Sequence, residues 1–314
     1  MQRYPGALLI MKTKIIVIVG PTATGKSALA VKLARKFGDE IISADSRQVY
    51  RGLNIGTGKI TKRQMRGVPH HLLDVAFPRR QFTVSQYKNL AEKLLRSIVV
   101  VKNKLPIIVG GSGFYIQALV DNISLPEVKP NPKLRKILEK KSSQKLFKIL
   151  KKLDPKRAAT IEPQNPRRLI RAIEIAKALG RVPPIERLSR HNLATKSLKP
   201  LFIGLTLPRQ ELRKRIEKRF KSWLKKRFLA EVKKLRGGGL SWKRFSEIGL
   251  NYKFAALFLQ NKINKKEFIE KSITAINQYA KRQMTWFKRD KRIKWFSPNE
   301  YQKIESLVRQ FLIF

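Results

Sequence analysis

The sequence predicts an α/β fold in which a mainly parallel β-sheet is flanked by helices and interrupted by a small helical insertion domain. Three observations predict it. Short apolar runs rich in Ile and Val alternate with segments whose apolar residues recur every three or four positions. A glycine-rich turn follows the first of these runs. Eight of the 16 prolines fall between residues 122 and 198, where no strand pattern is visible.

Strands and helices alternate over the first 121 residues. The short, β-branched apolar runs are typical of strands that are buried on both faces of a parallel sheet. The helical segments repeat apolar residues at a spacing of four, as Leu29, Leu33 and Phe37 do. In chain order we predict a strand at 14–20, a helix at 26–37, a strand EIISA ending at Asp45, a helix from about 85 to 102, a strand LPIIVGG and a helix that starts at Gly113.

The second part of the chain begins with the proline-rich stretch, which contains only short helical patterns. The run LFIGLTL at 201–207 then reads as a sheet strand again. The remaining pattern is helical, and its first helix, expected at 211–236, is stopped by Gly237–Gly239. We therefore predict a core formed by residues 14–121 and 199–314, and an insertion domain formed by residues 122–198.

The charge of the chain is strongly unbalanced. Lysine and arginine number 70 against 21 acidic residues, which gives a formal net charge of +49. Such an excess of one sign is costly through self-repulsion, so it favours a polyanionic partner such as a nucleic acid. A lysine bias across the whole proteome is the alternative explanation.

The chain contains no cysteine, which excludes disulfides and cysteine-based zinc sites and fits a reducing cytoplasm. No stretch approaches the roughly 20 apolar residues of a membrane-spanning helix, and the N-terminal apolar run is too short for a signal peptide. We therefore expect a cytoplasmic protein without a membrane anchor, and we expect it to be a monomer.

The turn GPTATGKS, residues 20–27, fits the pattern G-x-x-x-x-G-K-[ST] and lies between a predicted strand and a predicted helix. In such loops backbone N–H groups converge on an anion at a helix N-terminus. Lys26 is predicted to neutralise phosphate charge, and Ser27 to ligate Mg²⁺ through its hydroxyl. We therefore predict a P-loop NTPase-like core that binds a pyrophosphate group through Gly20, Pro21, Thr22, Ala23, Thr24, Gly25, Lys26 and Ser27.

The acid that usually accompanies this loop is missing. A P-loop NTPase usually continues with an apolar strand that ends in a magnesium-binding acid, whereas LPIIVGG ends in Gly110 and Gly111. The strand EIISA leads instead to Asp45, at the carboxyl edge of the sheet where ligands bind. Asp45 is therefore either a magnesium-side or structural acid, or a base that acts on a substrate.

Six motifs lie in order along the chain: GPTATGKS, ADSRQVY, PHHLLD, VGGSGFY, NPRRLIRAIE and AKRQMTWF. In this combination the chain resembles the tRNA dimethylallyltransferase family, also called tRNA isopentenyltransferase. The resemblance implies transfer of a dimethylallyl group from dimethylallyl pyrophosphate to N6 of the adenine 3′ to the anticodon, tRNA position 37, with release of pyrophosphate. Mg²⁺ is the expected cofactor. The expected partner is the anticodon stem-loop of tRNA, over which the insertion domain would close.

The resemblance also implies roles for single residues. The family's catalytic aspartate falls on Asp45, which would accept the proton of the adenine amine, and its hydroxyl residue in the VGG motif, usually threonine, falls on Ser112. Lys26 would stabilise the leaving pyrophosphate, and Arg282 would help to bind it. The residues expected to contact tRNA are Asp45, Ser46, Arg47, Gln48, Ser112, Arg135, Arg167, Arg168, Leu169, Ile170 and Arg171.

Two positions depart from the family pattern. An arginine that is common four residues before the lysine of AKRQ is Asn277 here, so Arg282 or another neighbour would have to replace it at the pyrophosphate. The usual G-Y-K/R motif appears as EIGLNYK, residues 247–253, which keeps Tyr252. His70 and His71 have no partners at metal-ligand spacing, and we predict that they are turn residues near the substrate crevice.

Three other functions fit parts of the sequence. A P-loop kinase acting on a small molecule or nucleotide would use the same loop, but it would consume ATP and would not explain the charge. Transfer to free adenine nucleotides would need no anticodon clamp. A non-catalytic tRNA-binding protein is disfavoured by the intact Lys26, Ser27 and Asp45.

Overall fold

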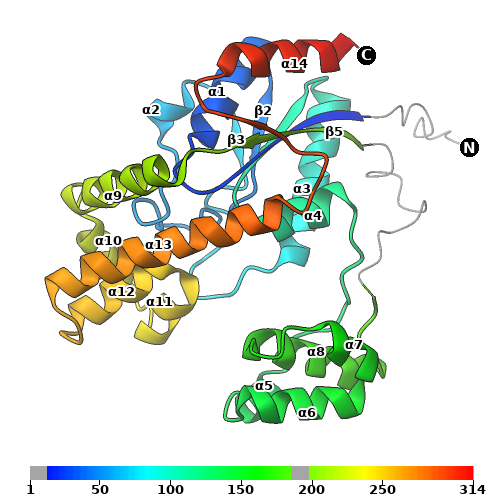
Figure 1. Cartoon of the computed structure of the whole chain (residues 1–314), viewed down its shortest axis with the longest axis vertical. Coiled ribbons are helices and arrows are strands. Elements are labelled where there is room, and N and C mark those ends of the chain that lie inside the picture. Colours follow the sequence, from blue (N-terminus) through cyan, green and yellow to red (C-terminus); the bar gives the residue numbers. More distant parts are fainter. Residues whose placement is uncertain (1–12, 185–197, 314) are drawn as a thin grey trace, which may run out of the picture. The chain divides into compact units, whose positions relative to one another are not determined.

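The computed structural model describes residues 13–184 and 198–313 (Figure 1). Its internal contacts divide the chain into two units, one made of residues 1–122 and 190–314 and the other of residues 123–189. The end of the predicted insertion domain, residues 185–197, lies outside the described residues.

The first unit is built on one six-stranded sheet with the strand order β3-β2-β4-β1-β5-β6. Every pairing between neighbouring strands is parallel, which confirms the predicted fold class. Parallel neighbours require crossover connections, and helices supply them here. The strands are β1 Thr13–Val19, β2 Glu40–Ser43, β3 His70–His71, β4 Pro106–Val109, β5 Leu198–Leu205 and β6 Lys294–Phe296.

The central strand β1 is apolar on both faces because both faces are covered. Ile15, Val17 and Val19 pack into one hydrophobic cluster. Ile16 and Ile18 pack into a second cluster on the opposite face. This burial explains why the strand reads as an unbroken apolar run and not as an alternating one.

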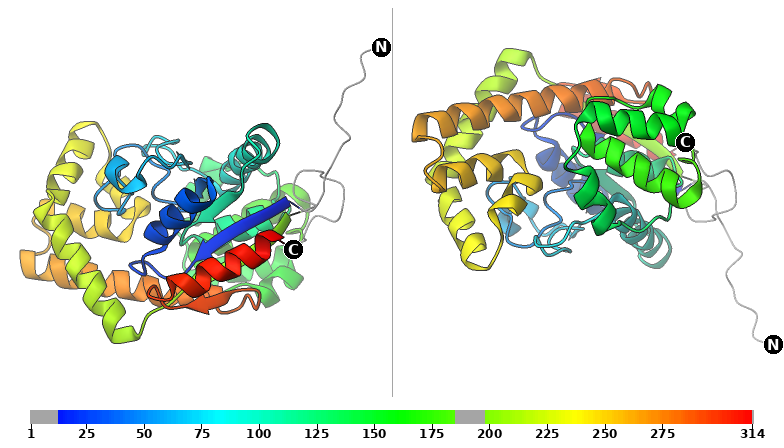
Figure 2. Two further views of the ribbon diagram at one scale, coloured as in Figure 1. Left: turned by 90° about the horizontal axis from the view of Figure 1, so that it is seen from above. Right: turned by 90° about the horizontal axis from the view of Figure 1, so that it is seen from below.

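Helices from distant parts of the chain cover the two faces. Residues of α3 and α4 belong to the first cluster, and residues of α1 and α14 belong to the second. Figure 2 shows α14, in red, running alongside β1 and close to α1. These helices are α1 Lys26–Phe37, α3 Val84–Arg96, α4 Gly113–Val120 and α14 Tyr301–Ile313, and the short α2 is Lys62–Met65.

A third hydrophobic cluster holds a group of helices beside the sheet, yellow-green to orange in Figure 1. Its members include Val49, Tyr50 and Leu53, so the segment that follows β2 is anchored to these helices and not to the sheet. The helices are α9 Arg209–Lys225, α10 Phe228–Gly237, α11 Trp242–Ile248, α12 Leu250–Leu259 and α13 Lys265–Phe287.

The described part of the second unit, residues 123–184, contains four short helices around its own hydrophobic cluster. Three of them start with an Asn or Asp cap followed directly by proline, which is the favoured residue at the first helical position. Pro132, Pro155 and Pro166 therefore begin helices and do not interrupt them. The helices are α5 Pro132–Leu138, α6 Ser143–Leu153, α7 Pro155–Thr160 and α8 Pro166–Leu179.

The structure corrects three sequence predictions about secondary structure. The helix expected at 211–236 is two helices, α9 and α10, because Arg227 adopts a left-handed conformation between them. The segment expected to be all helical after α9 contains the strand β6, which is too short for a strand pattern and is defined by its pairing with β5. His70 and His71 form strand β3 beside β2 and are not turn residues.

The helix expected from about 85 to 102 also ends differently. Its α-helical part stops at Arg96 and continues as a π-helical turn at Ser97–Val101. Within residues 13–184 and 198–313, no helix combines the length and the apolar character that crossing a membrane requires.

Asp39, just before β2, is expected to make the stability of the fold depend on pH. It is 4% exposed, and its Oδ1 accepts a hydrogen bond from the Leu105 N–H at 3.3 Å. Its Oδ2 is buried and has no hydrogen-bond partner within residues 13–184 and 198–313. Burial raises the pKa of Asp39 to about 7. Since the pKa is higher in the folded state than in the unfolded chain, stability falls as the pH rises from about 4 to about 7.

We therefore expect Asp39→Asn to be more stable than the wild type above pH 7, by about 2 kcal/mol, because it removes a buried charge. The difference should shrink as the pH falls towards 4. Urea unfolding between pH 4 and 8 measures it, and a difference that does not change with pH would contradict the assignment.

Candidate active site

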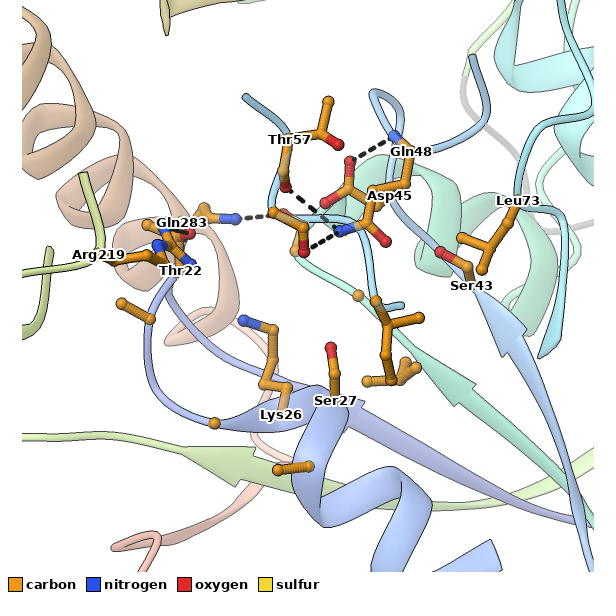
Figure 3. Close-up of a pocket in the computed structure, with 18 of the residues that line it drawn as sticks. Thr22, Lys26, Ser27, Ser43, Asp45, Gln48, Thr57, Leu73, Arg219 and Gln283 are labelled. Carbon is orange, nitrogen blue, oxygen red and sulfur yellow. Dashed lines mark hydrogen bonds between the residues drawn. The ribbon is translucent and has the colours of Figure 1, made fainter. Parts of the chain in front are cut away.

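A cavity of about 180 Å³ lies where the carboxyl ends of β1, β2 and β4 meet the helices α9 and α13. Figure 3 shows Lys26 and Ser27 on one side of it and Asp45, Gln48 and Thr57 on the other. The residues that line it are Thr22, Ala23, Gly25, Lys26, Ser27, Ala28, Ser43, Asp45, Gln48, Thr57, Gly58, Ile60, His70, Leu73, Val109, Gly110, Gly111, Arg219, Tyr279 and Gln283.

The turn GPTATGKS, residues 20–27, is called the phosphate-type loop from here on. Hydrogen bonds between its own residues stabilise it. The Thr24 hydroxyl is fully buried and donates to the Pro21 carbonyl at 2.9 Å. Gly25 then adopts a left-handed conformation as the N-cap of α1. The first turn of α1 thus begins at the cavity, with Lys26 and Ser27 among its lining residues. Gly20 and Pro21 support the loop and are not lining residues.

Lys26 lies at the base of this cavity. Its Nζ donates to the Pro21 carbonyl at 2.7 Å. Burial, and after it the nearby Arg219 guanidinium, lower the pKa of Lys26 to about 7, while the Asp45 carboxylate acts in the opposite direction. A phosphate anion in the cavity would favour the charged form of this amine. The site is therefore arranged to accept negative charge.

Asp45 uses its two carboxylate oxygens differently. Oδ1 accepts hydrogen bonds from the backbone N–H groups of Arg47, at 2.8 Å, and Gln48, at 3.3 Å. Oδ2 accepts none from the described residues. The side chain is thus fixed by one oxygen while the other remains available to a ligand in the cavity.

Ser112, from the VGG motif, supports the same segment from the side. Its hydroxyl oxygen accepts a hydrogen bond from the Ser46 N–H at 2.9 Å, and its own N–H donates to the Ala44 carbonyl at 3.2 Å. Ser112 does not line the cavity. The geometry connects Ser112 to the backbone that carries Asp45, and its catalytic and tRNA-binding roles stay predictions.

Gly110 and Gly111, which stand where an acid was expected, are both closely packed. A Cβ atom on Gly110 would lie 2.1 Å from the Ala44 carbonyl oxygen, and one on Gly111 would lie 2.1 Å from Nε2 of Gln283. Gln283 donates from Nε2 to the Gly111 carbonyl at 2.9 Å and accepts from the Thr22 N–H at 2.8 Å. It therefore ties the end of β4 to the phosphate-type loop, a role that sequence reasoning missed.

Arg219 is the main cavity residue that the sequence analysis did not identify. It comes from α9, its Nη2 donates to the Thr22 hydroxyl at 2.6 Å, and its guanidinium lies 4.9 Å from the Trp223 ring centre. Its Nε is buried without a hydrogen-bond partner among the described residues, and burial lowers the pKa of Arg219 to about 10. The sequence contains no signal that distinguishes this arginine from the other basic residues of the helix.

The arginine predicted to bind pyrophosphate occupies a different place. Arg282 is exposed and does not line the cavity; burial raises the pKa of Tyr279, a lining residue, to about 12, and the Arg282 charge only partly opposes that rise. Asn277, at the position of the family arginine, donates from Nδ2 to the Ile273 carbonyl of its own helix at 2.9 Å. The pyrophosphate role of Arg282 stays a prediction.

The predicted tRNA contacts of the second unit separate into three kinds. Leu169 and Ile170 are 0% and 8% exposed, because their side chains pack in its hydrophobic cluster, and their contact with tRNA stays a prediction. Arg135 and Arg171 share the buried carboxylate of Glu174, at 2.8 Å and 2.5 Å.

The remaining two arginines of the second unit, Arg167 and Arg168, are exposed. Arg168 also pairs with Glu162 at 3.3 Å. Of the residues predicted on this unit, these two are therefore the ones whose positive charge is most accessible to a polyanion.

The cavity holds few candidate metal ligands. Among the described residues, no group of three or more His, Cys, Asp or Glu side chains is arranged to hold a metal ion. The cavity does contain the hydroxyl of Ser27 and the carboxylate of Asp45. Mg²⁺ commonly binds proteins through one or two such groups and completes its coordination with phosphate oxygens and water.

Comparison with known proteins shows which protein family the chain belongs to. A family model described as IPP transferase matches residues 48–290. The chain is 37% identical to a tRNA dimethylallyltransferase from Syntrophomonas wolfei, covering 96% of this chain and 97% of that protein. It is 38% identical to one from Pelotomaculum thermopropionicum, with 95% of both chains covered.

Solved structures agree. The tRNA isopentenylpyrophosphate transferase from Bacillus halodurans matches with a TM-score of 0.70 and 34% identity, covering 95% of this chain and 96% of that one. A eukaryotic dimethylallyltransferase acting on tRNA matches with a TM-score of 0.77 and 25% identity, covering 96% and 79%. By its sequence and its fold, the chain belongs to the IPP transferase family, the tRNA dimethylallyltransferases.

Proposed function

We propose that this protein transfers a dimethylallyl group from dimethylallyl pyrophosphate to N6 of the adenine 3′ to the anticodon of tRNA, position 37, and releases pyrophosphate. The observation that supports this most strongly is the cavity itself. Lys26 of the phosphate-type loop, Arg219 of α9 and Asp45 all line it (Figure 3). This is the arrangement needed to bind a leaving anion and to deprotonate a nucleophile in a single site.

In the proposed reaction, the bond between the allylic carbon and the pyrophosphate oxygen breaks while a bond forms from adenine N6 to that carbon. Oδ2 of Asp45 accepts the proton that N6 loses. Negative charge grows on the departing pyrophosphate, and Lys26, Arg219 and the loop N–H groups stabilise it. The exocyclic amine is a poor nucleophile, so the placement of this carboxylate is central to the rate.

Mg²⁺ fits the donor groups of the cavity. We propose that the Ser27 hydroxyl holds it together with pyrophosphate oxygens, since no described cluster of acids would complete its coordination. When bound, the ion supplies additional positive charge to the leaving group.

We propose that the tRNA binds through backbone phosphates and that the target base leaves its stack to reach the cavity. The net charge of +49 and the exposed Arg167 and Arg168 support the phosphate contacts. Because tRNA is the substrate, we propose that the protein acts in the cytoplasm, and that it does so as a monomer.

A phosphoryl-transfer enzyme is the alternative with the same loop. It would need a magnesium-binding acid at the end of β4, where the chain has two glycines packed against neighbouring atoms. The similar proteins reported above are named as tRNA dimethylallyltransferases and not as kinases. The kinase is therefore not favoured.

Direct detection of the product tests the proposal. The protein is incubated with unmodified tRNA, Mg²⁺ and dimethylallyl pyrophosphate, and the tRNA is digested to nucleosides for mass spectrometry. We expect N6-dimethylallyladenosine at one site per tRNA, and none when the donor is omitted or replaced by ATP. A tRNA that stays unmodified under conditions where the protein binds it would contradict the proposed function.

A further inference from the structure

We propose that Glu231 is a positioning residue for this reaction: its carboxylate fixes the loop 54–58, which forms the cavity wall beside Asp45. The inference rests on the proposed function, because it assigns Glu231 a part in the same transfer. Glu231 itself does not line the cavity. It lies on α10, and the loop that it holds lies between β2 and β3 in the sequence.

The carboxylate of Glu231 receives four hydrogen bonds. Oε2 accepts from the backbone N–H groups of Asn54, at 2.9 Å, and Ile55, at 2.7 Å. Oε1 accepts from the Gly56 N–H at 3.2 Å and from the Tyr252 hydroxyl at 2.7 Å. Three consecutive N–H groups that converge on one anion define the conformation of the loop, and the hydroxyl orients the anion.

Residues of the motif EIGLNYK also bind the loop 54–58 and the Glu231 carboxylate. Asn251 donates from Nδ2 to the Gly56 carbonyl at 2.8 Å, while Tyr252 is buried and contacts Glu231. A Cβ atom on Gly56 would lie 2.3 Å from Cε2 of Phe228 and 2.8 Å from Cζ of Tyr252. The Gly56 peptide is thus bound through both its N–H and its carbonyl, in a space that no larger residue fits.

The loop transmits this restraint to the cavity. Thr57 and Gly58 line the cavity, and their carbonyls both accept from Nε2 of Gln48 at 3.4 Å. The backbone N–H of Gln48 donates in turn to Oδ1 of Asp45. Figure 3 shows Thr57, Gln48 and Asp45 together at one end of the cavity. Glu231 therefore acts on the reacting carboxylate through the loop and Gln48.

A merely structural role would also make Glu231 important, so the test must separate positioning from folding. The variant Glu231→Gln keeps the size of the side chain and removes the anion that three N–H groups share. Tyr252→Phe removes only the hydrogen bond that orients the carboxylate. Glu217→Gln is the matched control, because it makes the same change at an exposed residue of α9 that pairs with Lys221 at 2.6 Å.

Three measurements are made on each full-length variant below its unfolding temperature. Amide hydrogen exchange, resolved to the peptide that covers residues 53–59, reports the loop. Single-turnover transfer with saturating tRNA and dimethylallyl pyrophosphate reports the reaction, and a separate titration gives the affinity for pyrophosphate alone.

For Glu231→Gln we expect exchange in residues 53–59 to rise about tenfold while the strand β1 stays protected, and the single-turnover rate constant to fall about 10–100-fold. Affinity for pyrophosphate should stay within about twofold, because the phosphate-type loop is untouched. Tyr252→Phe should show the same changes to a smaller extent, and Glu217→Gln should show neither.

Three results would overturn the proposal. One is unchanged exchange in residues 53–59, whatever the activity. Another is a loosened loop with a wild-type rate constant. The third is increased exchange throughout β1 with a lowered unfolding temperature, which would mean a structural role only. If the wild type transfers no dimethylallyl group, the proposed function fails, and the exchange of the loop alone then decides whether Glu231 fixes it.

Discussion

Replacing Asp45 with asparagine is expected to lower the rate constant of dimethylallyl transfer by about 10²–10⁴-fold while leaving tRNA affinity nearly unchanged. Asparagine keeps an oxygen that can accept from the N–H groups of Arg47 and Gln48, so the turn that carries the side chain should persist. It replaces Oδ2 with an amide that cannot accept a proton. The change therefore removes the base and keeps its support.

The comparison with Asp45→Ala sharpens this test. Alanine removes both the base and the cap of the turn, so it should lose transfer to a similar extent and in addition weaken the tRNA complex. Single-turnover assays on tRNA and binding titrations give the two quantities separately. A wild-type rate for Asp45→Asn would show that another group accepts the proton from N6.

Arg219→Ala is expected to lower kcat/KM for dimethylallyl pyrophosphate by about 10²–10³-fold, mainly through weaker binding and poorer stabilisation of the leaving group. The guanidinium lines the cavity and contacts the phosphate-type loop through the Thr22 hydroxyl. An anion bound in the cavity would lie beside this positive charge. No sequence pattern distinguishes this residue, so the experiment tests a prediction of the tertiary structure.

Arg215→Ala is the matched control for Arg219→Ala. It lies one helical turn earlier on α9, where it is partly exposed and pairs with Glu211 at 2.8 Å. Both variants lose one positive charge from the same helix, so a general electrostatic effect would appear in both. Steady-state kinetics with varied donor, together with pyrophosphate titrations, should show the loss only for Arg219→Ala. Equal losses in the two variants would argue against a direct contact.

Local features of the sequence were enough to predict much of the fold. The strands β1, β2, β4 and β5 are apolar runs that a buried parallel strand requires, and α1 has the bounds that its apolar spacing predicts. The predictions failed where structure depends on a partner. The short strands β3 and β6 exist because they pair with β2 and β5, and the break between α9 and α10 depends on the conformation of a single residue, Arg227.

The residues of the candidate site also fall into those that local sequence predicts and those that depend on distant partners. The phosphate-type loop and Asp45 could be predicted because each lies directly after a strand, and parallel strands bring their carboxyl ends to one edge of the sheet. Arg219 and Gln283 come from helices more than 190 residues away from the loop that they contact. Their spacing in the sequence carries no record of that contact.

By itself, the sequence determined the type of fold, the loop that is suited to a phosphate and the acid beside it, because those features depend on neighbours along the chain. The tertiary structure alone decided which of many arginines enters the cavity, which predicted RNA contacts are core residues, and that Glu231 holds the wall of the site. The physical reason is that burial, pKa and hydrogen bonding at a side chain are set by every element packed around it, and most of those elements are distant in sequence.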